Sequence, residues 1–222
     1  MTTTNAEKLS PHANLTRAGS ESTARILAAA EELFAEHGFE AASINTIAER
    51  AGVSKANIFH HFSSKRELYL TVLHNACHKG SERLHNLETH TGTFNERFAA
   101  YAVDMLDDML DHERLHRLML RELLTENDGR LAKELAERVV GDKFARLVAV
   151  LRGGQGRGEL RADFDPAMAA IALIGANLFF LQSRNVFKHL PDVGFAADPG
   201  RYSALLADIL MRGILIAPND AK

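Results

Sequence analysis

The chain has 222 residues, 46% of them hydrophobic, with 26 basic and 29 acidic residues that leave a net charge of −3. This length suits one large domain or two small ones. The single cysteine, Cys77, excludes an internal disulfide and fits a reducing cytoplasm. The polar N-terminus lacks the apolar region of a signal peptide, and the longest apolar run, residues 167–181, looks too short to cross a bilayer. Without any sustained strand-like alternation, the sequence predicts an all-α, soluble, cytoplasmic protein with no membrane partner.

The N-terminal part of the chain begins with a polar segment, which is followed by apolar residues at helical spacing. Residues 1–19 are rich in Thr, Asn and Ser, so we expect a disordered tail. A basic arm for the DNA minor groove is the alternative. A first helix is expected from Ser20 to His37, ended by Gly38. Its core stripe consists of Ile26, Leu27, Ala30, Leu33 and Phe34.

Two short helices joined by a tight turn are predicted over residues 43–62. Apolar residues recur at helical spacing from Ile44 to Ala51, Ser43 is a candidate N-cap, and Gly52 follows where a left-handed residue ends a helix. Ser54 is a second candidate N-cap, and the helix after it has a polar and basic outer face. A short helix with such a face suits the major groove of DNA.

Spacing alone does not decide this point, because all-α proteins that never touch DNA also contain two short helices and a glycine turn. Between Ser43 and Arg66, however, Arg50, Lys55, Lys65 and Arg66 oppose a single acidic residue, Glu49. Positive charge is therefore concentrated here on an acidic chain, as a phosphate-binding surface requires.

The same region resembles the N-terminal domain of the TetR family of transcriptional regulators. The resemblance covers residues 25–73 and rests on IL-AA-LF-E-GF, then S-x-x-x-IA-x-x-AGVS, then F-H-H-F-x-S-K-x-x-L, in that order. It implies a helix-turn-helix domain and no enzymatic activity. His60 stands where the family more often has an aromatic ring, which changes the expected operator sequence but not the mode of binding.

The resemblance and the helix N-termini together indicate which residues contact DNA. Lys55 and Asn57 are the first candidates for base edges, since Lys prefers guanine and Asn prefers adenine. Phe59 could contact a thymine methyl group or could belong to the core. Helix N-termini favour phosphate. The full set is Ser43, Asn45, Ser54, Lys55, Ala56, Asn57, Phe59, His60, His61 and Lys65.

The remainder of the chain predicts a second helical domain. Ser64 and Glu67 form a capping box for a helix expected to run to about Glu88, which links a DNA-binding domain, residues 20–66, to an effector-binding and dimerisation domain, residues 67–222. Further helices are expected over residues 94–110, 115–123 and 131–151, and after Pro166 and Pro199. The glycine-rich residues 152–160 are expected to be a flexible link.

The helix after Pro166 is apolar nearly all round, so it must be buried on more than one side. We expect it and the last helix to pair with their copies in a homodimer, as a four-helix bundle. The family resemblance implies the same arrangement. Gly175, with Ala172 and Ala176, would allow close approach of two helices. The alternative is that both helices are ordinary core.

A cavity between the helices of the second domain would bind a small-molecule effector. Met and Phe walls favour an apolar or aromatic ligand, and Asn177 is a lone amide in an apolar run that needs a hydrogen-bond partner. Each of these residues could instead be simple core. The candidates are Phe98, Met105, Met109, Met119, Phe144, Asn177, Phe180 and Gln182.

Other chemistry is less well supported. His74, Cys77 and His78 could bind zinc, but histidines on a solvated face explain them better, and we expect no metal or cofactor. No nucleophile elbow, P-loop or H-E-x-x-H motif occurs. The sequence therefore predicts a ligand-responsive repressor that binds a palindromic double-stranded operator. An activator of the same fold, or an all-α enzyme or ligand-binding protein, is the alternative.

Overall fold

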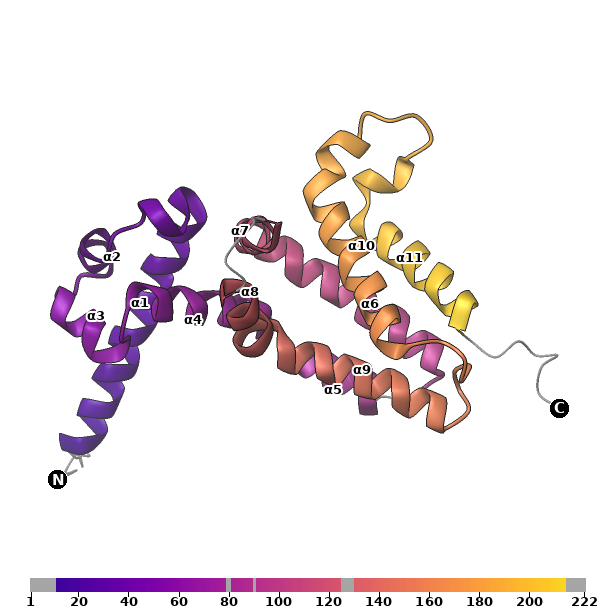
Figure 1. Cartoon of the computed structure of the whole chain (residues 1–222), viewed down its shortest axis with the longest axis horizontal. Helices are drawn as coiled ribbons and strands as arrows, with labels where there is room; N and C mark the ends of the chain where they lie inside the picture. Colours follow the sequence, from indigo (N-terminus) through magenta and orange to yellow (C-terminus); the bar gives the residue numbers. More distant parts are fainter. Residues whose placement is uncertain (1–10, 79–80, 90, 125–129, 215–222) are drawn as a thin grey trace, which may run out of the picture. The chain divides into compact units, whose positions relative to one another are not determined.

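The computed structural model describes residues 11–78, 81–89, 91–124 and 130–214, which form helices joined by short loops (Figure 1). The predicted all-α fold class is confirmed. Two segments depart from the α-helix: η1 is a π-helix and η2 a 3-10 helix. In chain order the elements are α1 (Pro11–Ala41), α2 (Ile44–Ala51), α3 (Lys55–His61), α4 (Lys65–His78), α5 (Ser81–Thr89), α6 (Phe94–Asp111), α7 (Glu113–Leu124), α8 (Arg130–Leu135), η1 (Ala136–Val140), α9 (Gly141–Gly156), α10 (Pro166–Phe187), η2 (Gly194–Ala197) and α11 (Pro199–Ile214).

The chain divides into two compact units, Met1–Val72 and Leu73–Lys222, and the division falls inside α4. In the first unit, α1 packs against α2 and α3 through a buried apolar core. Phe34 of α1 lies edge-on to Tyr69 of α4, with 5.0 Å between ring centroids. The predicted stripe of α1 is buried except for Leu27, which is half-buried.

The start of α1 corrects the expected disordered tail. The helix begins at Pro11 rather than Ser20, so residues 11–19 are helical, while residues 1–10 lie outside the described part of the chain. Proline suits the first position of a helix because its missing N–H would have no partner there, and extending an existing helix is far easier than nucleating one. At the other end Gly38 interrupts α1 with φ 80°, as predicted.

The helix predicted from Ser64 to Glu88 corresponds to α4, which is described to His78, and α5, described from Ser81, while residues 79 and 80 lie outside the described part of the chain. The predicted break after residue 88 is confirmed. There Thr93 opens α6 with a capping box: its N–H donates to Glu96 Oε2 at 2.8 Å, and the Glu96 N–H donates to Thr93 Oγ1 at 3.3 Å.

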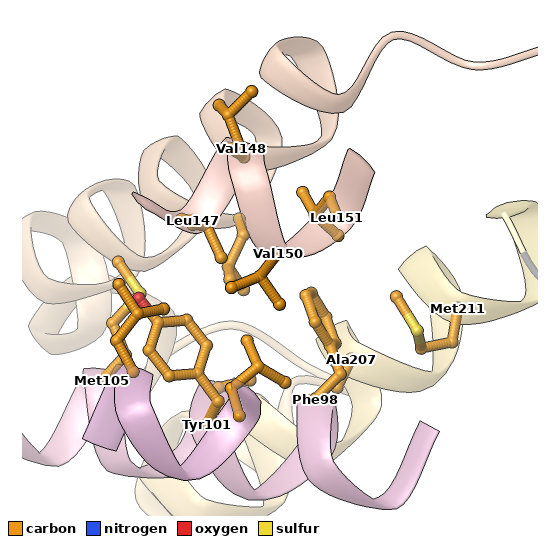
Figure 2. Close-up of a cluster of buried hydrophobic side chains, with 14 of the residues drawn as sticks. Phe98, Tyr101, Met105, Leu147, Val148, Val150, Leu151, Ala207 and Met211 are labelled. Carbon is orange, nitrogen blue, oxygen red and sulfur yellow. The ribbon is translucent and has the colours of Figure 1, made fainter. Parts of the chain in front are cut away.

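The core of the second unit forms where α6, α9 and α11 meet. Figure 2 shows side chains of α6 pointing toward those of α9 and α11. Around this centre α5 covers α6, and α10 packs against α9 and α11. The labelled members are Phe98, Tyr101, Met105, Leu147, Val148, Val150, Leu151, Ala207 and Met211.

The glycine-rich residues 152–160 are not the flexible link that we expected. α9 continues to Gly156, and Gly154 is buried inside it. A Cβ atom on Gly154 would lie 2.8 Å from Leu160 Cδ1 and 3.0 Å from Phe94 Cε2. The glycine is therefore needed for close packing, which sequence composition does not distinguish from flexibility.

α10 is longer than the apolar run that predicted it. Its 22 residues, with mean hydropathy 1.5 over an 18-residue window, are long and apolar enough to cross a membrane. This corrects the expectation that the segment is too short, because the helix continues past Leu181 to Phe187. Helices of soluble proteins meet the same two criteria, so this property alone assigns no membrane.

The helix predicted over residues 131–151 is divided by a π-helical turn. η1 is a wider helical turn than an α-helical one. A Cβ atom on Gly141, directly after it, would lie only 2.4 Å from the carbonyl oxygen of Ala136. That oxygen belongs to rigid backbone, so any side chain at position 141 would force the turn to rearrange. Such turns are often found next to functional sites.

We predict that Gly141→Ala lowers the free energy of unfolding by about 1–3 kcal/mol, because overpacking against backbone has no easy relief. Gly156→Ala is the matched control in the same helix, since nothing lies within 4 Å of a Cβ atom there. It should leave stability within about 0.5 kcal/mol of the wild type or raise it slightly. Urea unfolding followed by circular dichroism measures both; equal effects would mean that the turn tolerates a side chain.

Candidate DNA-binding face and ligand cavity

The predicted helix-turn-helix is present, and each of its predicted caps is confirmed. Ser43 Oγ accepts the Thr46 N–H at 3.0 Å, and Ser54 Oγ accepts the Asn57 N–H at 3.1 Å. Gly52 ends α2 in the left-handed conformation, with φ 64°. Because these bonds satisfy backbone donors at both helix starts, the turn between α2 and α3 is defined by local chemistry.

The outer face of α3 combines a cation, an aromatic ring and an imidazole. Lys55, Ala56, Phe59 and His60 are exposed, whereas Ile58 is completely buried. Phe59 is 45% exposed, so the alternative that it belongs to the core is wrong. The side chains of Ser43, Asn45 and Ser54 are also exposed, near the starts of α2 and α3.

Two of the predicted DNA-contacting residues are instead half-buried and bonded to α1. Ser22 Oγ donates to Asn57 Oδ1 at 2.6 Å, and Thr23 Oγ1 lies 3.3 Å from His61 Nδ1. These contacts hold α3 against α1 and so orient its exposed face. Ser22 and Thr23 gave no signal in the sequence, because they lie more than thirty positions from their partners.

Lys65 is engaged by backbone carbonyls of its own unit. Its Nζ donates to the carbonyl oxygens of Glu40 at 3.2 Å and Ala42 at 3.0 Å, and lies 4.4 Å from the centre of the Phe39 ring. The ammonium thus closes the connection between α1 and α2. Lys55, in contrast, extends from an exposed position on α3.

We predict that Lys65→Met lowers the free energy of unfolding by about 1–3 kcal/mol, because hydrogen bonds from a charged donor are lost. Lys55→Met is the matched control and should stay within about 0.5 kcal/mol of the wild type. Thermal and urea unfolding of the two variants would measure the difference. Equal stabilities would show that the Lys65 bonds contribute little.

The second unit contains a cavity of about 330 Å³, with walls from α4, α6, α7, η1, α9 and α10. Four predicted ligand residues, Met105, Met109, Met119 and Phe144, lie in its wall. The complete lining is Cys77, Tyr101, Met105, Asp108, Met109, His116, Met119, Val140, Lys143, Phe144, Leu147, Ile171, Ile174, Gly175 and Leu178.

The other four predicted ligand residues lie elsewhere. Phe98 is in the core, Phe180 stacks on Tyr202 with 3.9 Å between centroids, and Gln182 Oε1 accepts from Arg117 at 2.8 Å. Asn177 is completely buried, and neither polar atom of its amide has a hydrogen-bond partner among the described residues. α10 lines the cavity with another face, through Ile171, Ile174, Gly175 and Leu178, which the uniformly apolar sequence did not reveal.

A charged pair, which the sequence did not reveal, lies in the cavity wall. Lys143 Nζ is 3.9 Å from Asp108 Oδ2 and donates to the carbonyl oxygen of Cys77 at 2.9 Å. Their side chains are 24% and 8% exposed. The two charges come from α9 and α6, so only the fold brings them together.

The remaining polar groups of the wall are uncharged near neutral pH. Burial raises the pKa of the Cys77 thiol to about 11 and that of the Tyr101 hydroxyl to about 12. Burial also lowers the pKa of His116. Since His116 Nδ1 lies 3.2 Å from the carbonyl oxygen of His112, Nδ1 carries the proton and Nε2 is an acceptor.

The cysteine of the considered zinc cluster is part of this wall. Cys77 Sγ lies 3.5 Å from Met119 Sδ, on the face of α4 that borders the cavity. Within residues 11–78, 81–89, 91–124 and 130–214, no group of three or more His, Cys, Asp or Glu side chains could hold a metal ion. The side chain of His78 lies outside the described ones.

Comparison with known proteins relates both units to one family. Residues 26–72 match "Bacterial regulatory proteins, tetR family", and residues 88–185 match "Tetracyclin repressor-like, C-terminal domain". An HTH-type transcriptional activator of Mycolicibacterium smegmatis, FasR, is 34% identical over 125 residues, 54% of this chain and 52% of the relative, so the chain spans about half of its length. An HTH-type transcriptional repressor of Streptomyces coelicolor is 31% identical over 153 residues, 69% of this chain and 74% of the relative.

Solved structures resemble the fold over nearly its whole length. The repressor SmeT of Stenotrophomonas maltophilia, in complex with triclosan, has a TM-score of 0.66 and 25% identity. The match covers 89% of this chain and 93% of that one.

Proposed function

The chain belongs to the TetR family of bacterial transcriptional regulators, which are DNA-binding proteins and not enzymes, and we propose that it is a homodimeric repressor that a small apolar or aromatic effector releases from its operator. The exposed face of α3 is the observation that carries the proposal. Lys55, Phe59 and His60 project from a capped, seven-residue helix held against α1. In this position a cation can meet a base edge or phosphate, and a ring can meet a thymine methyl group.

The DNA-contacting residues have two different roles in this proposal. Lys55, Ala56, Phe59 and His60 face the major groove directly, and the start of α2, with Ser43 and Asn45, and Ser54 before α3, meet phosphates. Asn57, His61 and Lys65 act through bonds inside the unit that orient α3. The operator is double-stranded and palindromic, because a two-fold dimer presents two copies of α3.

We predict that Lys55→Ala and Phe59→Ala each weaken operator binding about 10-fold or more, since one good base contact contributes about 1–3 kcal/mol. The operator would be a duplex selected from random DNA by the wild-type protein, and binding would be followed by mobility shift at several salt concentrations. Lys133→Ala, an exposed lysine of α8, is the matched charge control. Unchanged affinity in both α3 variants, or affinity independent of salt, would count against the proposal.

Homodimerisation is supported by apolar side chains that α10 and α11 expose. Met168, Ile171, Phe179 and Val186 of α10 are 55–66% exposed at spacings that place them on one helix face, and Ile209 of α11 is 68% exposed. Regulators of this family are typically dimers. Gly175, which also lines the cavity, is exposed near this face, and nothing lies within 4 Å of a Cβ atom there. A second copy covering this face forms the four-helix bundle and explains why α10 is so apolar.

We predict that Ile209→Glu converts the dimer to a monomer and abolishes cooperative operator binding, because a charge at an apolar interface has no partner. Ala149→Glu, at an exposed position of α9, is the control and should remain dimeric. Light scattering coupled to size exclusion measures the mass of each. A wild-type monomer, or a dimeric Ile209→Glu variant, would refute this interface.

The effector acts through α4 in this proposal. The helix starts in the first unit, and Cys77 near its end lines the cavity. In the DNA-bound dimer, the two α3 helices are spaced to match operator half-sites about 34–36 Å apart. A ligand that fills the cavity and binds best when α4 is tilted changes this distance. It releases DNA only to the extent that it binds that state better. The triclosan complex of SmeT supports an apolar or aromatic effector.

Activation of transcription is the second candidate, because FasR is an activator and the Streptomyces coelicolor relative is a repressor. Both roles use the same DNA-binding face. A reporter gene behind the selected operator separates them, since deletion of the regulator raises expression if it represses and lowers expression if it activates. In either role we place the protein in the cytoplasm, where the DNA is.

A further inference from the structure

The charged end of the cavity restricts the ligands that it can accept. Asp108 and Lys143 contribute one carboxylate and one ammonium, 3.9 Å apart and largely withdrawn from solvent. Because opposite charges so close compensate each other, the wall has no net charge. A negatively charged ligand group at this end of the cavity would be repelled by Asp108, and a positively charged one would be repelled by Lys143.

We propose, on the premise that this cavity is the effector site, that the effector is an uncharged, mainly apolar molecule with one hydrogen-bonding group, such as a hydroxyl, at the Asp108–Lys143 end. A ligand carboxylate attracted by Lys143 would come to lie beside Asp108. A ligand ammonium attracted by Asp108 would lie beside Lys143. In both cases the ligand gives up its hydration and meets a like charge.

A hydroxyl group avoids this conflict because it both donates and accepts. It can accept a hydrogen bond from the Lys143 ammonium, which has three donors and uses one on the Cys77 carbonyl. It can donate to the Asp108 carboxylate or to Nε2 of His116. Since the Cys77 thiol and Tyr101 hydroxyl are also uncharged, no other described group of the wall calls for a charged ligand.

The rest of the wall sets the size and character of the ligand. At about 330 Å³ the cavity lies near the lower limit of small-molecule sites, roughly 300–1,000 Å³. Met105, Met109 and Met119 supply flexible, polarizable surface that adapts to chains or rings. Decanol, an unbranched alcohol, is therefore a suitable probe.

The test compares decanol, decanoate and decylamine, which share one apolar chain and differ only in the head group, by calorimetric titration of the full-length protein at neutral pH. We expect decanol to bind about 10-fold or more tightly than either ion. Asp108→Asn should raise the affinity for decanoate about 10-fold relative to decanol, since Lys143 then lacks its compensating carboxylate. Asp163→Asn removes an exposed carboxylate paired with Arg161 and should leave the ranking unchanged.

Decanoate binding to the wild type as tightly as decanol, an unchanged ranking in Asp108→Asn, or no binding of any of the three would each overturn the inference. Should Asp108→Asn not fold, the double variant Asp108→Asn/Lys143→Gln leaves no buried unpaired charge and is expected to keep the preference for decanol.

Operator release is measured separately. Decanol that binds with the expected ranking but leaves the operator occupied contradicts the regulatory function alone; decanoate that binds best and releases the operator contradicts only the ligand class.

Discussion

The ammonium group of Lys143 links three helices at the cavity of the second unit. A buried charge is stable only with partners, and this one finds them on two other helices: the Cys77 carbonyl near the end of α4 at 2.9 Å, and Asp108 of α6 at 3.9 Å. The π-helical turn before Gly141 determines where α9 begins, two residues before Lys143. The charge balance of the cavity wall and the hydrogen bond to the Cys77 carbonyl thus both involve one side chain.

The first unit uses a lysine in the same way. Lys65 binds two backbone carbonyls at the junction of α1 and α2, while Lys55 extends from an exposed face of α3. Two basic residues ten positions apart therefore have different tasks: one maintains the domain and the other is available to a phosphate or base. The bonds from Ser22 and Thr23 to α3 complete the arrangement, because a recognition helix must be held rigidly to present its face.

Local features were predicted well, and features that depend on distant contacts were not. The caps at Ser43, Gly52 and Ser54 were identified correctly, since each cap involves atoms within a few residues. The burial of Gly154 inside α9 was missed, because one of the two side chains that pack against it, Phe94, lies sixty positions away in the sequence. Only half of the predicted ligand residues lie in the cavity wall for a similar reason. Helical periodicity groups residues into faces of a helix but does not identify the neighbouring helix or cavity that each face contacts.

The sequence by itself determined the helical class, the helix-turn-helix and the family, because these follow from short-range periodicity, capping and linked motifs. The tertiary structure decided which basic side chains stay exposed, which residues surround the cavity and which face of α10 is left uncovered. On that helix Leu173 and Phe180 are buried whereas Met168 and Phe179 are exposed, although all four are apolar. Hydrophobicity favours burial without specifying a partner, so only the packing of neighbouring helices distinguishes them.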